Sequence, residues 1–425
     1  MAMTAAGDTR LWHPFADMGA VRHGELVIER GEDVWVWDHE GRRYLDATAS
    51  LWYCNVGHGR PEIAAAVADQ LSKLEAYSAF GDFASPPALE LAELLTDRAP
   101  MPSRVFLVSG GGDAIDTAAK LARRYWSELG QHERRVLVSR THGYHGTHGL
   151  GTAIGGIPAN REGFGAFPET EQVSHDSLED MRLAFERIGP ERIAAVFAEP
   201  VIGAGGVYPP APGYLEGVAE LCAETGVLFI VDSVICGFGR LGSWFGIERW
   251  GIEPDMIVFA KGVTSGYLPL GGVIVSDQTA EPFWDHAGGP VFRHGPTYAG
   301  HATCCAAALA NIALLEHDDL LARGRENEHA LLDALAPFAT LDIVGEVRGG
   351  VGTLAAVELT ADVLDREPRA VALTVAAARE AGVLIRPLAR AVAVSPPLTA
   401  DEEHFRLIAQ AVERGLQAAA PAALR

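Results

Sequence analysis

Six short apolar runs most narrowly limit the folds that this chain can adopt. They are rich in Val and Ile, and helical or turn-rich segments separate most of them. Strands of a parallel sheet are buried on both faces and have this composition, and the alternation with helices places helices on both sides of the sheet. The sequence therefore predicts an α/β protein with a mainly parallel sheet. The runs cover residues 104–109, 135–139, 193–198, 227–232, 256–260 and 271–276.

The segments on either side of these runs predict a second, smaller unit. Residues 34–47 form two apolar stretches about an Asp-His-Glu-Gly turn, which indicates a hairpin. A long helix is expected to start near His301 and to run past Glu316 toward Leu335, and the strand VLIRPL and a helix from Asp401 follow it. We expect an N-terminal segment over residues 1–60 that joins the small domain, a large domain over 61–315 and a C-terminal small domain over 316–425.

Composition excludes several classes of partner. The chain of 425 residues has 56 acidic and 34 basic side chains, and its net charge of −22 argues against nucleic acid, which clustered Lys and Arg bind. The five cysteines lie in apolar runs without CxxC spacing and predict neither a disulfide framework nor a zinc site. The 22-residue run from His294 to Leu315 lacks charged residues, but its Gly, Pro and polar residues favour a buried helix over a membrane span. Because residues 1–10 lack the apolar region of a secretory signal, we expect a cytoplasmic protein.

Residues at the carboxyl ends of three predicted strands suggest a cofactor site, because ligands of open parallel sheets bind at these ends. Gly110, Gly111 and Gly112 follow the first strand and open a helix, where free amides and the helix dipole attract an anion such as phosphate. Asp232 ends the fourth run, and Lys261 follows the fifth. Pyridoxal phosphate needs an amine to bond its aldehyde, an anion site for its phosphate and a carboxylate to keep its ring nitrogen protonated. Taken singly, these residues also fit a tight turn, a helix cap and a solvated lysine, but the set predicts this cofactor.

Lysine is rare in this chain, which makes each lysine informative. Only Lys73, Lys120 and Lys261 are lysines among the 34 basic residues, so the other 31 are arginines. Arginine replaces lysine well on solvated surfaces but cannot act as a neutral amine nucleophile. Lys73 and Lys120 lie within helical patterns and are interpreted as solvated residues, so Lys261 is the candidate nucleophile.

Two other motifs have competing interpretations. The glycines of residues 237–242 match the G-x-G-x-x-G pattern of dinucleotide sites, yet the segment does not join a strand directly to a helix, so a turn is favoured. His142, His145 and His148 recur at every third residue in a glycine-rich loop. No carboxylate accompanies them within the loop, so we predict no metal site.

Several long motifs stand in a recognisable order along the chain. They are LDATASLWYCNVGHGRPEI, AIDTAAKLARRYW, GYHG, FAEPVIGAGGVYPPAPGYL, VDSVICGFGRLG, PDMIVFAKGVTSGYLPLGG, HGPTYAGH and RPLARAVAVSPPL. With them, the chain from about Trp12 to Leu398 resembles the class III (omega) aminotransferases, which are fold-type I pyridoxal-phosphate enzymes. The resemblance implies a large domain with a mainly parallel sheet and a small α/β domain built from both ends of the chain.

The resemblance implies cofactor-binding roles for individual residues. Lys261 is similar to the lysine that bonds the cofactor aldehyde and later, as a free amine, moves the proton between the substrate carbon and the cofactor. Asp232 resembles the partner of the ring nitrogen, and Tyr144 resembles the aromatic residue that stacks on the ring. Gly111 and Gly112 correspond to the pair that binds the phosphate.

Four further site residues are implied by the same resemblance. Thr297 is similar to the threonine that reaches the phosphate from the other subunit, which implies a homodimer with shared active sites and leaves a tetramer open. Glu199 corresponds to a family acid near the cofactor. Trp52 corresponds to an aromatic residue of the substrate pocket, and Arg386 to the movable arginine that binds an acceptor carboxylate through two N–H groups.

The chain departs from the family pattern at three places. The Ser-Gly-Ser-Glu phosphate loop is replaced by residues 110–113, the Asn after the loop is Ile115, and the Glu of the Asp-Glu-Val triplet is Ser233. Without the loop serine, phosphate binding is expected to rest on backbone amides, Thr297 and the helix dipole, with weaker cofactor retention. Ser233 removes a carboxylate that the family pattern places beside the ring.

The resemblance predicts a pyridoxal-phosphate-dependent aminotransferase. It implies transfer of an amino group from a primary amine or omega-amino compound to a 2-oxo acid such as pyruvate by a ping-pong mechanism. A 7,8-diaminopelargonate-type aminotransferase, a racemase or aminomutase on the same fold, and a cofactor-binding protein without activity are the alternatives. The donor amine and the preferred enantiomer are not predicted.

Overall fold

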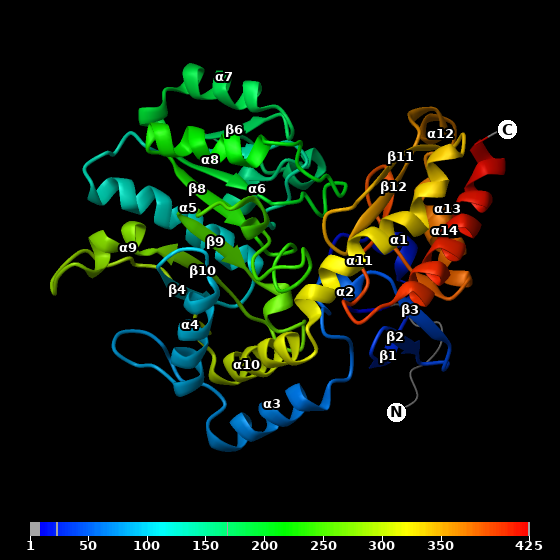
Figure 1. Cartoon of the computed structure of the whole chain (residues 1–425), viewed down its shortest axis with the longest axis horizontal. Coiled ribbons are helices and arrows are strands. Elements are labelled where there is room, and N and C mark those ends of the chain that lie inside the picture. Colours follow the sequence, from blue (N-terminus) through cyan, green and yellow to red (C-terminus); the bar gives the residue numbers. More distant parts are fainter. Residues whose placement is uncertain (1–8, 23, 168, 424–425) are drawn as a thin grey trace.

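The computed structural model describes residues 9–22, 24–167 and 169–423, and its elements form two groups (Figure 1). A large sheet and its helices make up one group. Both ends of the chain contribute to the other, in which blue N-terminal strands lie near orange and red C-terminal elements. The predicted α/β class is confirmed.

A seven-stranded sheet forms the centre of the larger group. Its strands, in spatial order, are β4 (Ser103–Val108), β10 (Gly271–Ser276), β9 (Met256–Phe259), β8 (Leu228–Asp232), β7 (Ile193–Ala198), β5 (Val136–Arg140) and β6 (Thr170–Val173). From β9 to β6 neighbouring strands run parallel, whereas β10 is antiparallel to both of its neighbours. All six apolar runs form strands. The short edge strand β6 was not among them, because its sequence TEQV is mostly polar.

Helices cover both faces of this sheet. In β7, Val196 and Ala198 belong to one hydrophobic core, and Ala195 and Phe197 belong to another. Successive side chains of a strand point to opposite faces, so the two cores lie on the two sides of the sheet. The helices of this group are α3 (Pro61–Lys73), α4 (Pro86–Arg98), α5 (Gly111–Glu128), α6 (Gly149–Ile154), α7 (Leu178–Ile188), α8 (Tyr214–Thr225), α9 (Asp277–Trp284) and α10 (Ala302–His317).

The uncharged run at residues 294–315 supplies most of α10, which is a buried helix as predicted. It packs against α3 and α4, and its buried residues include Cys304, Cys305 and Asn311. None of the helices in the described ranges is both long and apolar enough to cross a membrane.

The single long helix expected from His301 toward Leu335 is wrong, because the chain forms two helices there. α10 ends at His317, and α11 covers Leu320–Leu335. Between them, Asp319 adopts a left-handed backbone with φ of 51°. Aspartate tolerates this conformation better than most residues, and its side chain competes with helical hydrogen bonds. The apolar periodicity continues across the break and therefore does not reveal it.

The smaller group contains two four-stranded sheets. One has the order β1 (Ile28–Glu32), β2 (Trp35–Asp38), β3 (Arg43–Asp46) and β13 (Val383–Leu384), and the other has the order β11 (Val344–Arg348), β12 (Ala355–Leu359), β15 (Ala391–Val394) and β14 (Arg386–Pro387). The predicted hairpin is confirmed, since β2 and β3 pair antiparallel. The predicted strand VLIRPL is divided between the sheets: β13 pairs with β3, and β14 pairs with β15.

The two chain ends share one hydrophobic core in this group. Val34 and Leu45 from the N-terminal segment pack in the same cluster as Val383 and Phe405. The shared core brings together parts of the two chain ends, whereas the predicted domain division at residues 60 and 315 stays a prediction and residues 1–8 lie outside the described ranges. The remaining helices are α1 (Met18–Val21), α2 (Ala49–Trp52), α12 (Ala361–Arg366), α13 (Ala370–Glu380) and α14 (Glu402–Ala423), with 3₁₀ turns at Pro158–Arg161, Pro190–Arg192, Ile247–Trp250, Lys261–Val263 and Ala336–Thr340.

Candidate active site

The carboxyl ends of β8 and β9 lie side by side and open into a pocket. Asp232 is the last residue of β8, Lys261 follows the end of β9, and the parallel pairing sets Asp232 opposite Val258. The fold therefore brings together the two strand-end residues that sequence reasoning singles out. The pocket is lined by Gly111, Gly112, Ile115, Tyr144, His145, Gly146, Glu199, Asp232, Val234, Ile235 and Lys261.

The Lys261 amine has the properties of a nucleophile. Lys261 is half-buried, and its amine has no hydrogen-bond partner among the residues that the structure describes. Loss of hydration lowers the pKa of Lys261 to about 8, against the opposing influence of the Asp232 and Glu199 carboxylates. The amine is therefore neutral in roughly a tenth of the molecules at pH 7, far more than an ordinary lysine, and the neutral form is the one that attacks an aldehyde.

The backbone around Lys261 is strained and is held in place by α10. Lys261 has φ of 48°, in the left-handed region that non-glycine residues avoid. Asn311 of α10 donates from Nδ2 to the carbonyl oxygens of Gly262 at 2.9 Å and Val263 at 3.0 Å. Because Asn311 is fully buried, these two bonds hold the loop of residues 261–267, called the lysine loop below, without competition from water.

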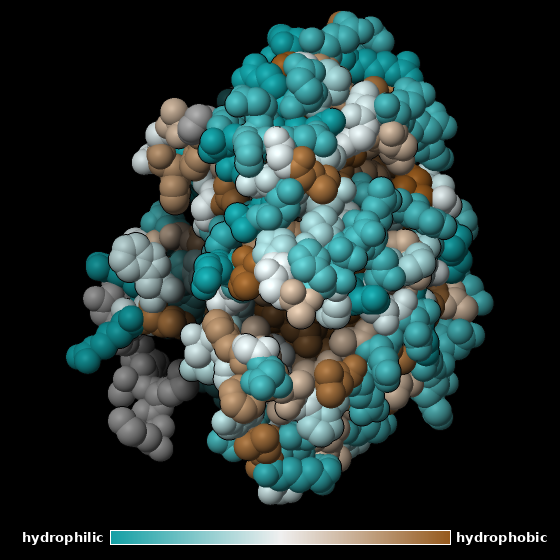
Figure 2. Space-filling view, turned by 90° about the vertical axis from the view of Figure 1, so that its left-hand side faces the viewer, coloured by the Kyte–Doolittle hydropathy of each residue, from teal (hydrophilic) through white to brown (hydrophobic). Residues whose placement is uncertain are grey.

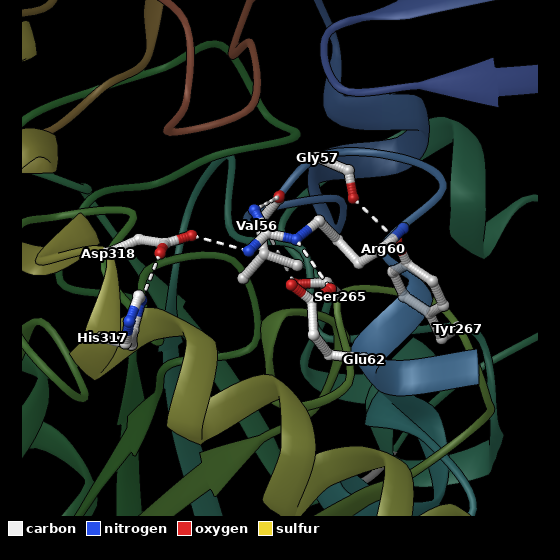
Figure 3. Close-up of polar contacts among 8 residues, drawn as sticks. All are labelled: Val56, Gly57, Arg60, Glu62, Ser265, Tyr267, His317 and Asp318. Carbon is white, nitrogen blue, oxygen red and sulfur yellow. Dashed lines mark hydrogen bonds and ion pairs between the residues drawn. The ribbon is translucent and has the colours of Figure 1, made fainter. Parts of the chain in front are cut away.

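A second anchor holds the end of the lysine loop (Figure 3). The Tyr267 hydroxyl donates to the carbonyl oxygen of Gly57 at 3.0 Å and accepts from the amide of Arg60 at 2.7 Å. The Ser265 hydroxyl accepts an amide hydrogen bond from the same N-terminal segment. The Arg60 guanidinium continues to Asp318 Oδ2 at 2.7 Å, at the break between α10 and α11. The lysine loop is thus tied to the segment that connects the two groups of elements.

The Asp232 carboxylate is buried and oriented by His145. Its Oδ2 lies 2.8 Å from Nδ1 of His145, whose side chain is 1% exposed, and its Oδ1 accepts from the amide of Val234 at 3.1 Å. A hydrogen bond between a histidine and a carboxylate fixes the direction of both groups. Sequence reasoning treats His145 only as a metal candidate and misses this contact. The available signal was its position next to Tyr144 in the GYHG motif.

Glu199 supports the loop that carries Tyr144. Its buried carboxylate accepts hydrogen bonds from the amides of Tyr144 and Gly203, each at 2.9 Å. Burial raises the pKa of Glu199, and the nearby His145 opposes this effect. The half-buried Tyr144 lines the pocket, where loss of hydration raises the pKa of its hydroxyl. Glu199 therefore positions an aromatic wall of the pocket through the backbone.

The amino end of α5 forms a wall that suits an anion. Gly111 and Gly112 are the first two residues of this 18-residue helix, and no side chain caps its end. The first amides of a helix have no intrahelical acceptor, and the helix dipole adds positive charge there. A Cβ on Gly111 would lie 3.1 Å from Cγ1 of Val234, so glycine allows the helix end to approach the pocket floor closely.

Two departures from the family pattern have clear structural consequences. Ser233 is fully buried, and its hydroxyl donates to the carbonyl oxygen of Phe245 at 2.6 Å. It does not line the pocket, so a hydrogen bond to the adjoining loop stands where the family pattern has a carboxylate. Ile115 does line the pocket and packs into the core beneath α5.

The two predicted substrate residues lie outside the pocket lining. Trp52 is 3% exposed and packs in a core with Ile235, which is a lining residue. Arg386 on β14 is half-buried, and in the described part of the chain its Nε is buried without a hydrogen-bond partner. Its charge contributes to the lowered pKa of Lys261, which indicates that it lies close to the lysine.

Thr297 lies at a different place from the other predicted residues. It is exposed and lines a separate cavity together with Tyr77, Phe80 and Tyr298. Within one protomer, the structure therefore does not bring Thr297 to the pocket that contains Lys261.

The rival motifs have structural roles. In residues 237–242, two amides donate to the carbonyl oxygens of Ser243 and Trp244, so the amides that a dinucleotide phosphate would need are used within the turn. His142 stacks against the ring of Tyr208, with ring centroids 5.0 Å apart. No group of His, Cys, Asp or Glu side chains in the described ranges is arranged to hold a metal ion.

The residues around the pocket fit pyridoxal phosphate. One cavity is surrounded by four kinds of group: the amine of Lys261, the buried carboxylate of Asp232, the aromatic ring of Tyr144 and the first amides of α5. They match the aldehyde, ring nitrogen, ring face and phosphate of this cofactor. The fold and the pocket are those of a fold-type I pyridoxal-phosphate enzyme.

Comparison with known families gives the same result. The family model described as "Aminotransferase class-III" matches residues 18–416. The chain belongs to the class III aminotransferases and is a pyridoxal-phosphate-dependent transaminase, which takes an amine donor and an oxo-acid acceptor. The predicted family, fold class and cofactor are confirmed.

Individual relatives are similar over nearly their whole length. Putrescine–pyruvate aminotransferase of Pseudomonas aeruginosa is 37% identical over 418 residues, which cover 92% of this chain and 91% of that protein. Adenosylmethionine-8-amino-7-oxononanoate aminotransferase of Anoxybacillus flavithermus is 34% identical over 421 residues, with 93% and 92% covered. The solved structure of a thermostable (S)-enantioselective omega-transaminase from Thermomicrobium roseum superposes with a TM-score of 0.90 at 38% identity and covers 96% of each chain.

Proposed function

We propose that this chain transfers an amino group from a primary amine or omega-amino compound to a 2-oxo acid such as pyruvate by a ping-pong mechanism. The observation that carries the proposal is that Lys261, Asp232 and the amino end of α5 line one pocket. The similarity to an enzyme named putrescine–pyruvate aminotransferase supports this substrate class.

Lys261 and Asp232 perform the central roles in this proposal. When bound, the cofactor supplies a ring that accepts electrons and so stabilises negative charge on the substrate carbon. Lys261 would hold the cofactor through its aldehyde, and its amine, when free, would move the proton between the substrate carbon and the cofactor. The pKa of about 8 suits this role, since a general base works best near the operating pH. Asp232 holds a proton at the ring nitrogen, and His145 keeps the Asp232 carboxylate in place.

The pocket walls orient the cofactor and exclude water. Tyr144 stacks on the ring face, and Glu199 holds the Tyr144 backbone in position. The amides of Gly111 and Gly112 bind the phosphate at the positive end of α5.

Carboxylate binding is assigned to Arg386, and Trp52 supports the wall of the pocket. The unpaired, buried Nε of Arg386 leaves a guanidinium able to receive the carboxylate of a 2-oxo acid through two N–H groups. Trp52 shapes the pocket indirectly, because it supports the lining residue Ile235 from behind.

We propose that the active enzyme is a homodimer with shared sites, in which Thr297 reaches the phosphate bound by the partner subunit. Thr297 is exposed beside Phe80 and Tyr298, which are 52% and 66% exposed. Figure 2 shows hydrophobic side chains around a hollow on the face that lies to the left in Figure 1. Exposed apolar surface of this kind is typical of a subunit interface.

The experiment that tests the function combines a substrate panel with a lysine variant. The wild-type protein is incubated with pyruvate and a series of amines, and alanine production identifies the donors. Lys261→Ala is expected to remain folded and to form no alanine, whereas the matched control Lys73→Ala, which changes an exposed helix lysine paired with Asp69, keeps full turnover. Borohydride reduction of the loaded wild-type protein is expected to label position 261. Turnover by Lys261→Ala at the wild-type rate would defeat the proposal.

A further inference from the structure

His148 occupies the space that a side chain at position 112 would need. Gly112 stands where the family pattern has a serine, and its backbone is helical, a conformation that any residue adopts. A Cβ built on Gly112 would lie 3.0 Å from Cε1 of His148 and 3.1 Å from both ring nitrogens. A side chain at position 112 would therefore crowd the imidazole in its present position, whereas the backbone itself places no restriction on the residue.

The loop that carries His148 lies directly on the amino end of α5. A Cβ on Gly146 would lie 3.1 Å from Cα of Gly112, so the two segments touch backbone to backbone. Asp116, one turn into α5, accepts from the amide of Gly151 at 2.8 Å and holds the far side of the loop. These contacts on both sides of His148 place it beside Gly112 and Asp113 in the first turn of α5, next to the pocket lining, with its side chain 53% exposed.

The ring of His148 has one nitrogen in use and one available. Nδ1 lies 3.4 Å from Oδ1 of Asp113, while Nε2 has no partner in the described ranges. Because the Asp113 carboxylate only accepts, Nδ1 is the donor toward it, and Nε2 also carries a hydrogen when the ring is an imidazolium, which donates from both nitrogens. In that form the ring is a donor of the kind that phosphate oxygens accept, and a donor near a helix end acts together with the helix amides.

We propose that His148 donates a hydrogen bond to the cofactor phosphate and so replaces the serine hydroxyl that this chain lacks. The inference rests on the proposed function, because it takes the amino end of α5 as the phosphate site. Gly112 and His148 are then complementary. The absence of a side chain at position 112 leaves space for the His148 imidazole, and the imidazole supplies the hydrogen-bond donor that the family serine would supply.

The test measures cofactor retention rather than turnover. Loaded wild-type protein, His148→Ala and His148→Gln are diluted, and release of pyridoxal phosphate is followed by absorbance. Loss of a hydrogen bond to a charged group corresponds to roughly tenfold or faster release, so His148→Ala is expected to lose cofactor at least that much faster. His148→Gln, which keeps an N–H donor, is expected to recover part of the retention. Thr147→Ala, an exposed neighbour in the same loop, is the matched control.

Two further measurements separate phosphate binding from loop structure. Binding of pyridoxal, which lacks the phosphate, is expected to be equal in the wild type and His148→Ala. The double variant Gly112→Ser with His148→Ala is expected to retain cofactor better than His148→Ala, because the serine hydroxyl then has room to bind the phosphate. Unchanged retention by His148→Ala, or an equal loss of pyridoxal and pyridoxal phosphate, would overturn the role of His148. Failure of the wild type to bind the cofactor would instead overturn the proposed function.

Discussion

At the scale of single residues, the proposed chemistry depends on the protonation of Lys261. Its pKa is lowered from 10.5 to about 8 by loss of hydration. The reactive neutral form therefore grows as the pH rises through about 8, where an ordinary lysine is still almost fully protonated.

This shift predicts the pH dependence of cofactor attachment. The rate at which cofactor-free protein bonds pyridoxal phosphate is expected to rise with pH, reach half its maximum near pH 8 and then level off. Stopped-flow absorbance over a pH series measures it. Because the Arg386 charge adds to the lowering, Arg386→Met is expected to move the midpoint upward. A wild-type midpoint near 10.5 would contradict the prediction.

A second prediction at this scale concerns the acceptor carboxylate. Removing a partly buried charged partner costs at least roughly tenfold in binding, so Arg386→Ala is expected to lower kcat/KM for pyruvate by that factor or more. The half-reaction with an apolar amine should change much less, since such an amine presents no carboxylate. Single-turnover kinetics of each half-reaction measure the two effects. The control is Arg390→Ala, an exposed arginine near the same strand that pairs with Glu358. Equal losses in both half-reactions would remove Arg386 from this role.

At the scale of secondary-structure elements, the strained lysine loop depends on helix α10. Asn311→Leu keeps a similar volume but leaves two buried carbonyl oxygens without their donor. We expect a loss of roughly 2 to 4 kcal/mol in the free energy of unfolding and a slower attachment of cofactor. Denaturant titration at a fixed protein concentration measures the first effect. Asn160→Leu, at a partly exposed position on a surface turn, serves as the control. An unchanged attachment rate would show that the loop holds its shape without α10.

The elements also show where sequence patterns succeed and fail. The six apolar runs became strands because burial on both faces demands continuous Val and Ile, a property of the run itself. The break between α10 and α11 was not predictable from periodicity, since apolar residues continue on both sides of Asp319. The division of VLIRPL between two sheets depends on which neighbours the strand meets, and β3 lies more than 300 residues away in sequence.

At the scale of the whole molecule, shared sites predict complementation between inactive subunits. In the proposed dimer, Lys261→Ala and Thr297→Asp are each expected to abolish activity in their own homodimers, the second because a carboxylate repels the cofactor phosphate. A mixed dimer contains one site in which both changes meet and one site in which neither occurs. Co-expression with two affinity tags is therefore expected to give purified mixed dimers with about half of the wild-type activity per dimer. Inactive mixed dimers would place Thr297 in the site of its own subunit.

The α/β class, the strand-end positions of Asp232 and Lys261 and the glycine opening of α5 were all predictable from the order of residues along the chain. These follow from local composition, because the carboxyl ends of parallel strands meet at one edge of a sheet whatever the rest of the chain does. The family resemblance added the roles of these residues and of Trp52 and Thr297, and all of these roles stay predictions.

The groups that support the site come together through the packing of distant segments. His145 contacts Asp232, which lies 87 positions further along the sequence, and Asn311 contacts Gly262, which lies 49 positions earlier. The His148 ring lies next to Gly112. Such contacts depend on how distant segments pack in three dimensions, and the local periodicity of apolar residues does not predict that packing. Chain composition therefore indicates the chemistry of the site, and the folded arrangement sets its geometry.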